Sequence, residues 1–399
     1  MPRSLADAIN IDDLRTLAKR RMPKALFDFV DGGAEDEVSL RDNRSQFDRW
    51  RLIAGHPVSV TTRDLSVEIF GERIAAPFII SPTGLAALTR GRAEVALARG
   101  AQKVGIPMTL STAASISIED LARSAAGARR WFQLYIFKDR EFTQSLIERA
   151  KKAGYTALVV SVDCPVLGQR ERDFRNRMTI PLRPTATNVI DVLRRPGWLF
   201  DFLTHGVPKP ENFTGLRSNG AQSLIVQMQE QFDPSVSWAD IAWVRSQWQG
   251  PLIIKGIVSA IDARLAIERG VDGVVVSNQG GRQLDHAVPT LEALPYVVDA
   301  VGQRATVFCD GGFRRGTDVV KALALGAKAV FLGRATLFGV AAGGETGVVR
   351  ALRILCDELD RAMALMGCAS LDQIDHATIW DRFHDRFRQY PRQTREVDA

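Results

Sequence analysis

Eight short apolar runs recur along this chain, and each is followed by a polar turn and a segment with the apolar spacing of a helix. The runs span Pro77–Ser81, Ile106–Leu110, Trp131–Tyr135, Ala157–Val162, Leu252–Lys255, Gly273–Ser277, Thr306–Asp310 and Ala329–Leu332. Strict alternation of strands and helices predicts parallel strands joined by crossover helices. An open doubly wound sheet would need a G-x-G-x-x-G turn after its first strand, and this chain contains none. The sequence therefore predicts an α/β fold, a closed (β/α)8 barrel of the TIM type.

Three segments stand outside this alternation and suggest additions to the barrel. Residues 1–70 read as a helical lead-in packed on a barrel of residues 71–385, and residues 386–399 read as a C-terminal tail. The barrel is interrupted after its fourth strand by a long insertion, residues 167–235, rich in Arg, Pro and Asn. Loops of this length in compact domains are usually lids or binding segments.

The insertion contains one apolar patch, Trp198–Leu203, preceded by Arg194 and Arg195. A lid helix packed on the barrel or on a neighbouring subunit is the favoured interpretation. The alternative is peripheral contact of residues 190–205 with a membrane surface.

Charge and cysteine content narrow the class of protein. The net charge of +6 and the pI near 9.3 are basic, but Lys and Arg alternate with Asp and Glu without a basic stripe, so nucleic acid is not expected as a partner. The chain lacks a signal-peptide pattern and any run of the ~20 apolar residues that a membrane span needs. Its four cysteines show no C-x-x-C spacing, so no metal site is expected. These features favour the cytoplasm, with the inner face of the membrane as the alternative.

Polar residues cluster where the predicted strands end. In chain order the candidates are Pro82, Thr83, Gly84, Ser111, Gln133, Tyr135, Ser161, Asp163, Lys255, Ser277, Gln279, Asp310, Gly312, Gly333 and Arg334. Catalytic residues of a (β/α)8 barrel lie at these carboxyl ends. We therefore expect these side chains to surround one site.

The last two strand ends predict a phosphate site. Asp310-Gly311-Gly312 leads to Arg314, and Gly333-Arg334 follows the eighth strand. Glycines let backbone N–H groups approach an anion, arginines donate in a fork, and phosphate sites of this fold commonly lie after strands seven and eight. A lysine at the barrel mouth, Lys255, also needs an anion. Together they suggest FMN or pyridoxal phosphate as cofactor, with Schiff-base chemistry as the rival role of the lysine.

Arg170 and Arg282 follow the fourth and sixth strands. Because planar guanidinium groups match a carboxylate bidentately, the pair favours a small carboxylic acid as substrate.

These motifs resemble the FMN-dependent family of α-hydroxy-acid dehydrogenases and oxidases, which includes L-lactate dehydrogenase, glycolate oxidase and, most similar, mandelate dehydrogenase. The resemblance runs from about Ile11 to Phe383. Its motifs are RMPKALFDFVDGGAEDE, SPTGL, LSTAASISIEDLA, WFQLY, KG at 255–256, SNQGGRQLD, DGGFRRGTDVVKALALGA and LGRATLFG.

The resemblance implies roles for most of the candidates. Around the flavin ring it places Pro82, Thr83, Gly84, Ser111, Gln133, Ser161, Lys255 and Ser277. At the ribityl phosphate it places Asp310, Gly312, Arg314, Gly333 and Arg334. At the substrate it places Tyr135, Arg170 and Arg282, with Tyr135 and Arg282 stabilising the developing charge. It further implies a homotetramer and a quinone, protein or O2 as electron acceptor. Glycine at position 84 favours a quinone or protein acceptor over O2.

Two departures from the family pattern bear on activity. Gln279 stands where the family has a histidine that takes a proton from the substrate and is oriented by an aspartate, here Asp163. An amide has no useful basicity near pH 7. In addition, Phe27 is aligned with a substrate-binding tyrosine of the family. His286 is a conceivable substitute base, but nothing in the sequence directs it at the mouth.

Three functions therefore remain open. The default is oxidation of a small 2-hydroxy acid to a 2-oxo acid with hydride transfer to flavin N5. In that case Gln279 is either the natural residue of the enzyme or a substitution that inactivates it. The alternatives are a repurposed enzyme that oxidises an amino acid or another carboxylate, and a catalytically silent FMN-binding protein.

Overall fold

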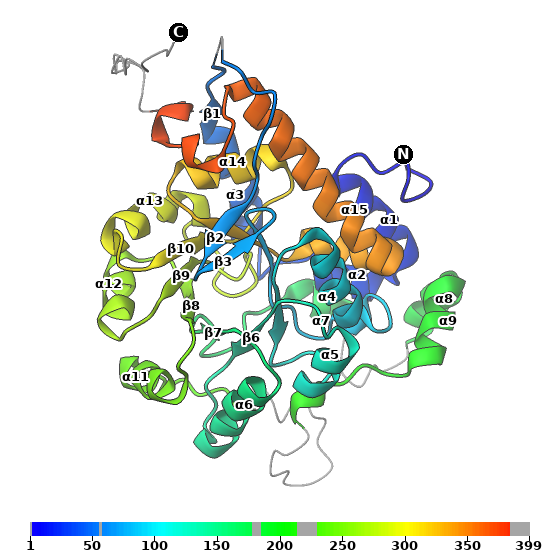
Figure 1. Cartoon of the computed structure of the whole chain (residues 1–399). Coiled ribbons are helices and arrows are strands. Elements are labelled where there is room, and N and C mark those ends of the chain that lie inside the picture. The colour runs from blue at the N-terminus through cyan, green and yellow to red at the C-terminus, as the bar shows by residue number, and fades with distance from the viewer. Residues whose placement is uncertain (1, 56–57, 178–184, 214–229, 384–399) are drawn as a thin grey trace.

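The computed structural model describes residues 2–55, 58–177, 185–213 and 230–383 (Figure 1). Its centre is a closed barrel of eight parallel strands in the order β10-β11-β4-β5-β6-β7-β8-β9. The strands are β4 (Phe78–Ile80), β5 (Met108–Ser111), β6 (Arg130–Leu134), β7 (Ala157–Ser161), β8 (Leu252–Ile257), β9 (Gly273–Val276), β10 (Thr306–Cys309) and β11 (Ala329–Leu332). Each predicted run overlaps one of these strands, so the predicted fold is confirmed.

The strands are buried along almost their whole length, as expected for a parallel sheet covered by helices. The covering helices are α4 (Ala93–Val104), α5 (Ile118–Ser124), α6 (Arg140–Lys152), α11 (Trp238–Gln247), α12 (Ala260–Glu268), α13 (Thr290–Val301), α14 (Gly316–Ala324) and α15 (Arg334–Met366). Ser117 caps α5 by accepting the Asp120 N–H. Alternation of strand and helix brings all eight strand ends to one mouth, where the candidate residues lie.

The lead-in packs around the barrel and covers the end opposite the mouth. Its helices are α1 (Ile11–Arg21), α2 (Lys24–Asp31) and α3 (Val38–Ser45), and its strands are β1 (Trp50–Leu52), β2 (Val67–Ile69) and β3 (Glu72–Ile74). Strand β1 pairs antiparallel with β12 (Ile379–Asp381), near the end of the described chain (Figure 1). The boundary expected at residue 70 falls in the turn of the β2–β3 hairpin. There the Phe70 ring lies 6.1 Å from Trp131 and 6.0 Å from Phe308, at the amino ends of the strands.

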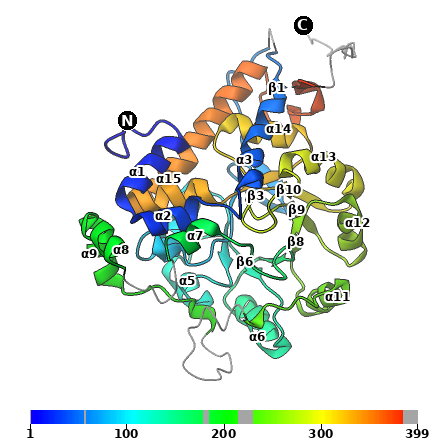
Figure 2. The same cartoon turned by 180° about the vertical axis from the view of Figure 1, so that it is seen from behind.

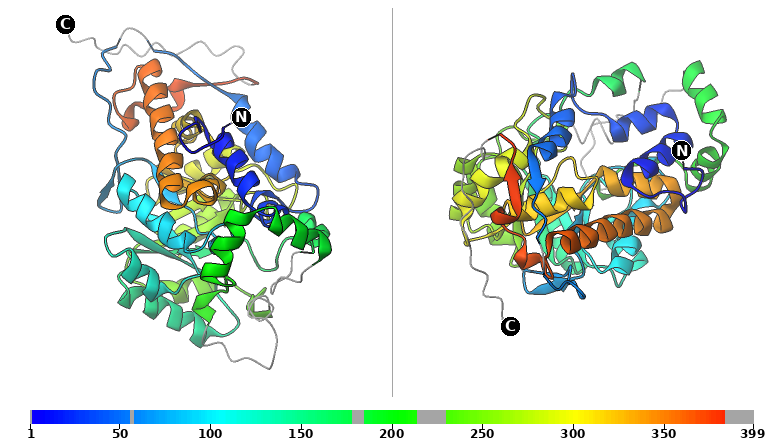
Figure 3. Two further views of the ribbon diagram at one scale, coloured as in Figure 1. Left: turned by 90° about the vertical axis from the view of Figure 1, so that its right-hand side faces the viewer. Right: turned by 90° about the horizontal axis from the view of Figure 1, so that it is seen from above.

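The insertion forms α7 (Glu171–Arg175), α8 (Ala186–Leu193) and α9 (Pro196–His205), and α8 and α9 project at the edge of the molecule beside α1 and α2 (Figures 1, 2 and 3). Trp198 is buried and donates its indole N–H to the Leu88 carbonyl at 3.1 Å. On the opposite side Phe200 is 73% exposed and Leu203 is 71% exposed. One face of α9 thus packs on the barrel, while the other leaves apolar side chains in solvent.

None of the helices in the described ranges combines the length and the apolar character required to cross a membrane. The predicted tail, residues 386–399, lies outside the described residues, as do residues 178–184 and 214–229 of the insertion.

Candidate active site

Lys255 is the centre of the cluster at the barrel mouth. It is 2% exposed, donates to the Ser277 hydroxyl at 2.9 Å and to the Gln279 side-chain oxygen, and lies 3.3 Å from an Asp310 carboxylate oxygen. Burial alone would lower the pKa of Lys255, but the Asp310 and Asp163 carboxylates outweigh it and raise that pKa above its usual value. The side chain is therefore an ammonium ion at neutral pH.

Gln279 takes its orientation from this ammonium. Its backbone has φ of +54°, in the left-handed region, and its N–H donates to the Ser277 hydroxyl at 3.1 Å. An ammonium ion can only donate, so the amide must turn its oxygen toward Lys255. The amide nitrogen then faces the Tyr135 hydroxyl at 3.4 Å and the Cys164 sulfur at 3.6 Å. Gln279 thus presents N–H groups, and no basic atom, to this part of the site.

Tyr135, Cys164 and Asp163 complete this side of the cluster. Burial raises the pKa values of the Tyr135 hydroxyl and the Cys164 thiol well above their usual values, so both groups are neutral. Burial also raises the pKa of Asp163, and its Oδ2 has no hydrogen-bond partner among the described residues. Sequence reasoning missed Cys164, although its position directly after Asp163 at a strand end was a usable signal.

Several of the residues predicted to bind the cofactor have polar side-chain atoms without partners. Gln133 Nε2, Ser161 Oγ and Asp310 Oδ1 are buried without partners among the described residues, while Ser111 donates to the Gln133 side-chain oxygen at 3.1 Å. Buried polar groups without partners are costly, so these atoms fit a ligand with several hydrogen-bonding atoms. Pro82, Thr83 and Gly84 follow β4 at the same end of the barrel.

The predicted phosphate end carries a concentration of positive charge. Gly312 has φ of +83°, and a Cβ there would lie 2.3 Å from the Asn43 carbonyl oxygen, so only glycine fits. Burial and the neighbouring Arg334 lower the pKa of Arg314 to about 9. Burial lowers the pKa of Arg334 to about 10, although its guanidinium donates to the carbonyls of Val30, Gly32 and Gly280. An anion beside these arginines would remove that penalty. A Cβ on Gly333 would meet only Ser81, at 3.8 Å.

Arg170 and Arg282 lie on one aromatic ring. Their guanidinium carbons are 5.2 Å and 5.3 Å from the centroid of Phe29, and Arg282 donates to the Phe29 and Gly32 carbonyls at the end of α2. Burial and then the Arg170 cation lower the pKa of Arg282 well below its usual value. Asp173, 3.3 Å from Arg170, balances part of this charge. The remainder suits a carboxylate ligand.

The structure does not bring Phe27 to this pair. Phe27 is 3% exposed and packs on Phe338, with ring centroids 6.3 Å apart. Phe29, two residues later on α2, takes the position beside the arginines because residues two apart on a helix face different directions. The sequence predicted Phe27 at this position, whereas the structure places Phe29, the second phenylalanine of the FDF motif, beside the two arginines.

None of the three histidines that the structure describes replaces Gln279. His205 lies on α9 against the Asp201 carbonyl, His286 is exposed, and the His376 ring packs on Trp50. His56 and His384 lie outside the described residues.

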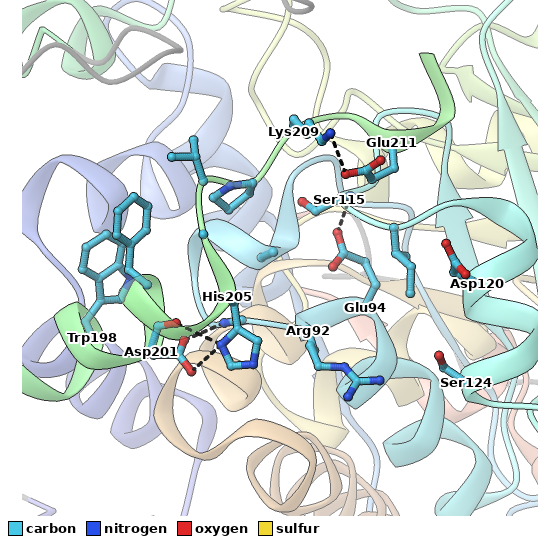
Figure 4. A pocket seen from close by; sticks show the side chains of 17 residues that line it. Arg92, Glu94, Ser115, Asp120, Ser124, Trp198, Asp201, His205, Lys209 and Glu211 are labelled. Carbon is cyan, nitrogen blue, oxygen red and sulfur yellow. Dashed lines mark hydrogen bonds and ion pairs between the residues drawn. The ribbon is translucent and has the colours of Figure 1, made fainter. Parts of the chain in front are cut away.

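A separate cavity of about 480 Å³ lies where the insertion meets α4 and α5 (Figure 4). Asp201 contacts His205 on one of its walls, and Glu94 accepts the Ser115 N–H on another. None of the candidate residues lines it. The Trp198 hydrogen bond and the Gly91 N–H, which donates to Asp201 at 2.6 Å, hold α9 against the barrel.

Fold and site define a (β/α)8 barrel whose mouth can hold a phosphate-bearing cofactor and a carboxylate side by side. The FMN-dependent dehydrogenase family matches residues 18–381. The chain is 44% identical to (S)-mandelate dehydrogenase of Pseudomonas putida over 92% of each chain, and 41% identical to human 2-hydroxyacid oxidase 1 over 93% of this chain and 96% of that one. A crystal structure of the monotopic membrane protein (S)-mandelate dehydrogenase superposes with a TM-score of 0.90 at 44% identity, covering 94% of this chain and 99% of that one.

The chain therefore belongs to the FMN-dependent dehydrogenase family, which includes 2-hydroxy-acid dehydrogenases and oxidases. It is a flavoprotein oxidoreductase that uses FMN.

Proposed function

We propose that this enzyme oxidises a small 2-substituted carboxylic acid at C2, in the default case a 2-hydroxy acid to a 2-oxo acid. The observation that carries the proposal is the Arg170–Arg282 pair on Phe29, whose incompletely balanced positive charge lies on the same mouth as Lys255. A carboxylate bound there would place the neighbouring C2 atom close to the cofactor residues.

The FMN site is proposed from the unpartnered groups and the glycines. Ser111, Gln133, Ser161, Ser277, Pro82, Thr83 and Gly84 would surround the ring, and Asp310, Gly312, Arg314, Gly333 and Arg334 would hold the ribityl phosphate. Lys255 would lie at the N1–C2=O edge of the flavin ring, where negative charge develops when the flavin is reduced. When bound, FMN would supply the acceptor for one hydride, which carries both electrons of the oxidation.

The substrate would be held by this chain's own groups. Arg170 and Arg282 would bind its carboxylate, Tyr135 would donate its hydroxyl proton to the C2 substituent, and Asp163 would act on that region electrostatically. Gln279 cannot accept a proton, so the proton of a hydroxyl substituent has no obvious acceptor here.

Anaerobic flavin bleaching tests the proposal. Purified holoprotein is mixed with lactate, mandelate, glycolate and a panel of 2-amino acids, and the flavin absorbance is followed. Bleaching by a 2-substituted acid, but not by the matching alcohol or amine without a carboxylate, is expected. Tight FMN binding without bleaching by any acid would instead favour a catalytically silent FMN-binding protein.

The phosphate assignment predicts a defect in cofactor binding. Changing Arg314 to Gln removes a charge-assisted donor and should weaken FMN binding to the apoprotein roughly 10–100-fold. The control is Arg315→Gln, because that exposed neighbour pairs with Glu358 at 2.6 Å. Fluorescence titration of the apoprotein with FMN measures both dissociation constants. Equal affinities in the two variants would contradict the assignment.

The exposed faces of α8 and α9 support peripheral contact with a membrane. Leu193, Phe200 and Leu203 are 62%, 73% and 71% exposed, and Arg194 and Arg195 adjoin them. Apolar side chains beside arginines suit the interface of an anionic bilayer. A quinone in that bilayer, a protein or O2 would then reoxidise the flavin, and a homotetramer is the proposed assembly.

This contact predicts a loss of vesicle binding. The Phe200→Ser/Leu203→Ser variant should co-sediment with anionic vesicles at least about tenfold less, because each buried apolar side chain contributes roughly 1.5–3 kcal/mol. Ile261→Ser/Leu365→Ser, which changes side chains 64% and 60% exposed elsewhere, is the matched control. Equal binding by both variants would argue against the insertion as the membrane contact.

A further inference from the structure

The groups around the position of the C2 substituent are donors or cations, apart from three aspartates. The cations are Lys255 on β8, Arg170 after β7 and Arg282 after β9. The neutral groups are Tyr135 after β6, Cys164 after β7 and Gln279 after β9. The aspartates are Asp163, Asp173 and Asp310.

The three aspartates are occupied or enclosed. Asp310 is 6% exposed and lies 3.3 Å from the Lys255 ammonium, and Asp173 is 9% exposed and lies 3.3 Å from Arg170. The Asp163 oxygen Oδ1 lies 3.6 Å from the Cys164 sulfur, and the other oxygen, Oδ2, is buried without a partner among the described residues. Asp173 and Asp310 are therefore paired with cations, and Asp163 Oδ2 is not exposed at the mouth.

Gln279 presents a hydrogen-bond donor where a base would be needed to accept a proton. The Lys255 ammonium holds its amide oxygen, so its nitrogen faces Tyr135 and Cys164. Reversing the amide would set an NH2 group against an ammonium, two donors with no acceptor between them. The position is thus fixed as a donor.

Resting on the proposed function, we infer that the C2 substituent of the substrate is an amine that binds as its uncharged free base. A hydroxyl must lose its proton to a base as C2 is oxidised, whereas a neutral amine need not. The C2–H bond breaks, the hydride leaves with both electrons to oxidised FMN, and the nitrogen lone pair forms the C=N bond. The product is an iminium ion, which water hydrolyses to the 2-oxo acid and ammonium.

The same surroundings exclude the protonated amine. An ammonium substituent would meet the N–H groups of Gln279 and the Lys255 cation, neither of which can accept a hydrogen bond. A 2-amino acid should therefore bind more tightly as the pH rises toward the pKa of its own amine. While the pH is below that pKa, each increase of one pH unit raises the free-base fraction about tenfold, and the affinity should rise with it.

The test is binding without turnover. Two analogues that lack a C2 hydrogen, a 2-methyl-2-amino acid and the 2-methyl-2-hydroxy acid with the same side chain, are titrated into the holoenzyme between pH 6.5 and 9, and perturbation of the flavin absorbance gives the dissociation constants. We expect the affinity for the amine to rise about tenfold per pH unit and the affinity for the hydroxy acid to stay nearly flat or fall. Gln279→Glu supplies a carboxylate for the ammonium and should abolish most of the rise, with FMN content as the folding control.

Two results would overturn the inference. Tighter binding of the amine at low pH, or flavin bleaching by 2-hydroxy acids alone, would exclude the free-base amine and leave the proposed function intact. If neither analogue nor a simple carboxylate perturbs the flavin at any pH, the proposed carboxylate site fails as well.

Discussion

Replacing Gln279 by histidine is expected to raise the rate of flavin reduction by a 2-hydroxy acid about 10²–10⁴-fold, the usual contribution of a general base. The imidazole would lie within the cluster of Lys255, Tyr135 and Asp163, and the unpartnered Asp163 Oδ2 could accept its second N–H. That hydrogen bond would orient the ring and stabilise its protonated form. Anaerobic stopped-flow absorbance with lactate and mandelate measures the rate.

Gln279→Asn is the control, because it changes the side chain without adding a base. Wild-type reduction by a hydroxy acid at the rate of the histidine variant would show that the chain already has a base that the described residues do not reveal. An inactive histidine variant with normal FMN content would show that the pocket differs from a hydroxy-acid site at further positions.

Changing Arg282 to Lys is expected to lower kcat/KM for the substrate roughly 10²–10³-fold. The guanidinium already donates to the Phe29 and Gly32 carbonyls and lies 5.3 Å from the Phe29 ring centroid, so its remaining donors are held in place for a carboxylate. Lysine cannot form a bidentate pair, and breaking a buried charge pair costs several kcal/mol. Steady-state kinetics with an artificial electron acceptor measures the loss.

Arg172→Lys is the matched control for this change. Arg172 pairs with Asp31 and Glu37 in the lead-in and has no assigned role at the mouth, so its variant should keep kcat/KM within a few-fold of wild type. Equal losses in both variants, or a loss of FMN from Arg282→Lys, would indicate a structural role for Arg282.

The barrel could be predicted because its determinants are local. An apolar run followed by apolar residues at helical spacing indicates a strand and a crossover helix. Eight such repeats indicate a closed (β/α)8 barrel. The predicted phosphate end rests on a similar local signal, since Gly312 and Arg314 adjoin one strand end and Gly333 and Arg334 the next.

The remaining features depend on contacts between distant residues. The pairing of β1 with β12 joins Trp50 to Asp381, and periodicity carries no signal for such a partner. The choice between Phe27 and Phe29 depends on how α2 is rotated against the barrel, which the FDF motif does not specify. The orientation of Gln279 depends on Lys255, which lies 24 residues away in sequence.

The most direct test of the central claim compares wild type and Gln279→His with two substrates that share one side chain, a 2-amino acid and the matching 2-hydroxy acid. The rate of anaerobic flavin reduction is measured by stopped flow at pH 8.5 for all four combinations. We predict that wild type is reduced faster by the amino acid and the variant faster by the hydroxy acid. Faster reduction of wild type by the hydroxy acid, with no gain in the variant, would contradict the account.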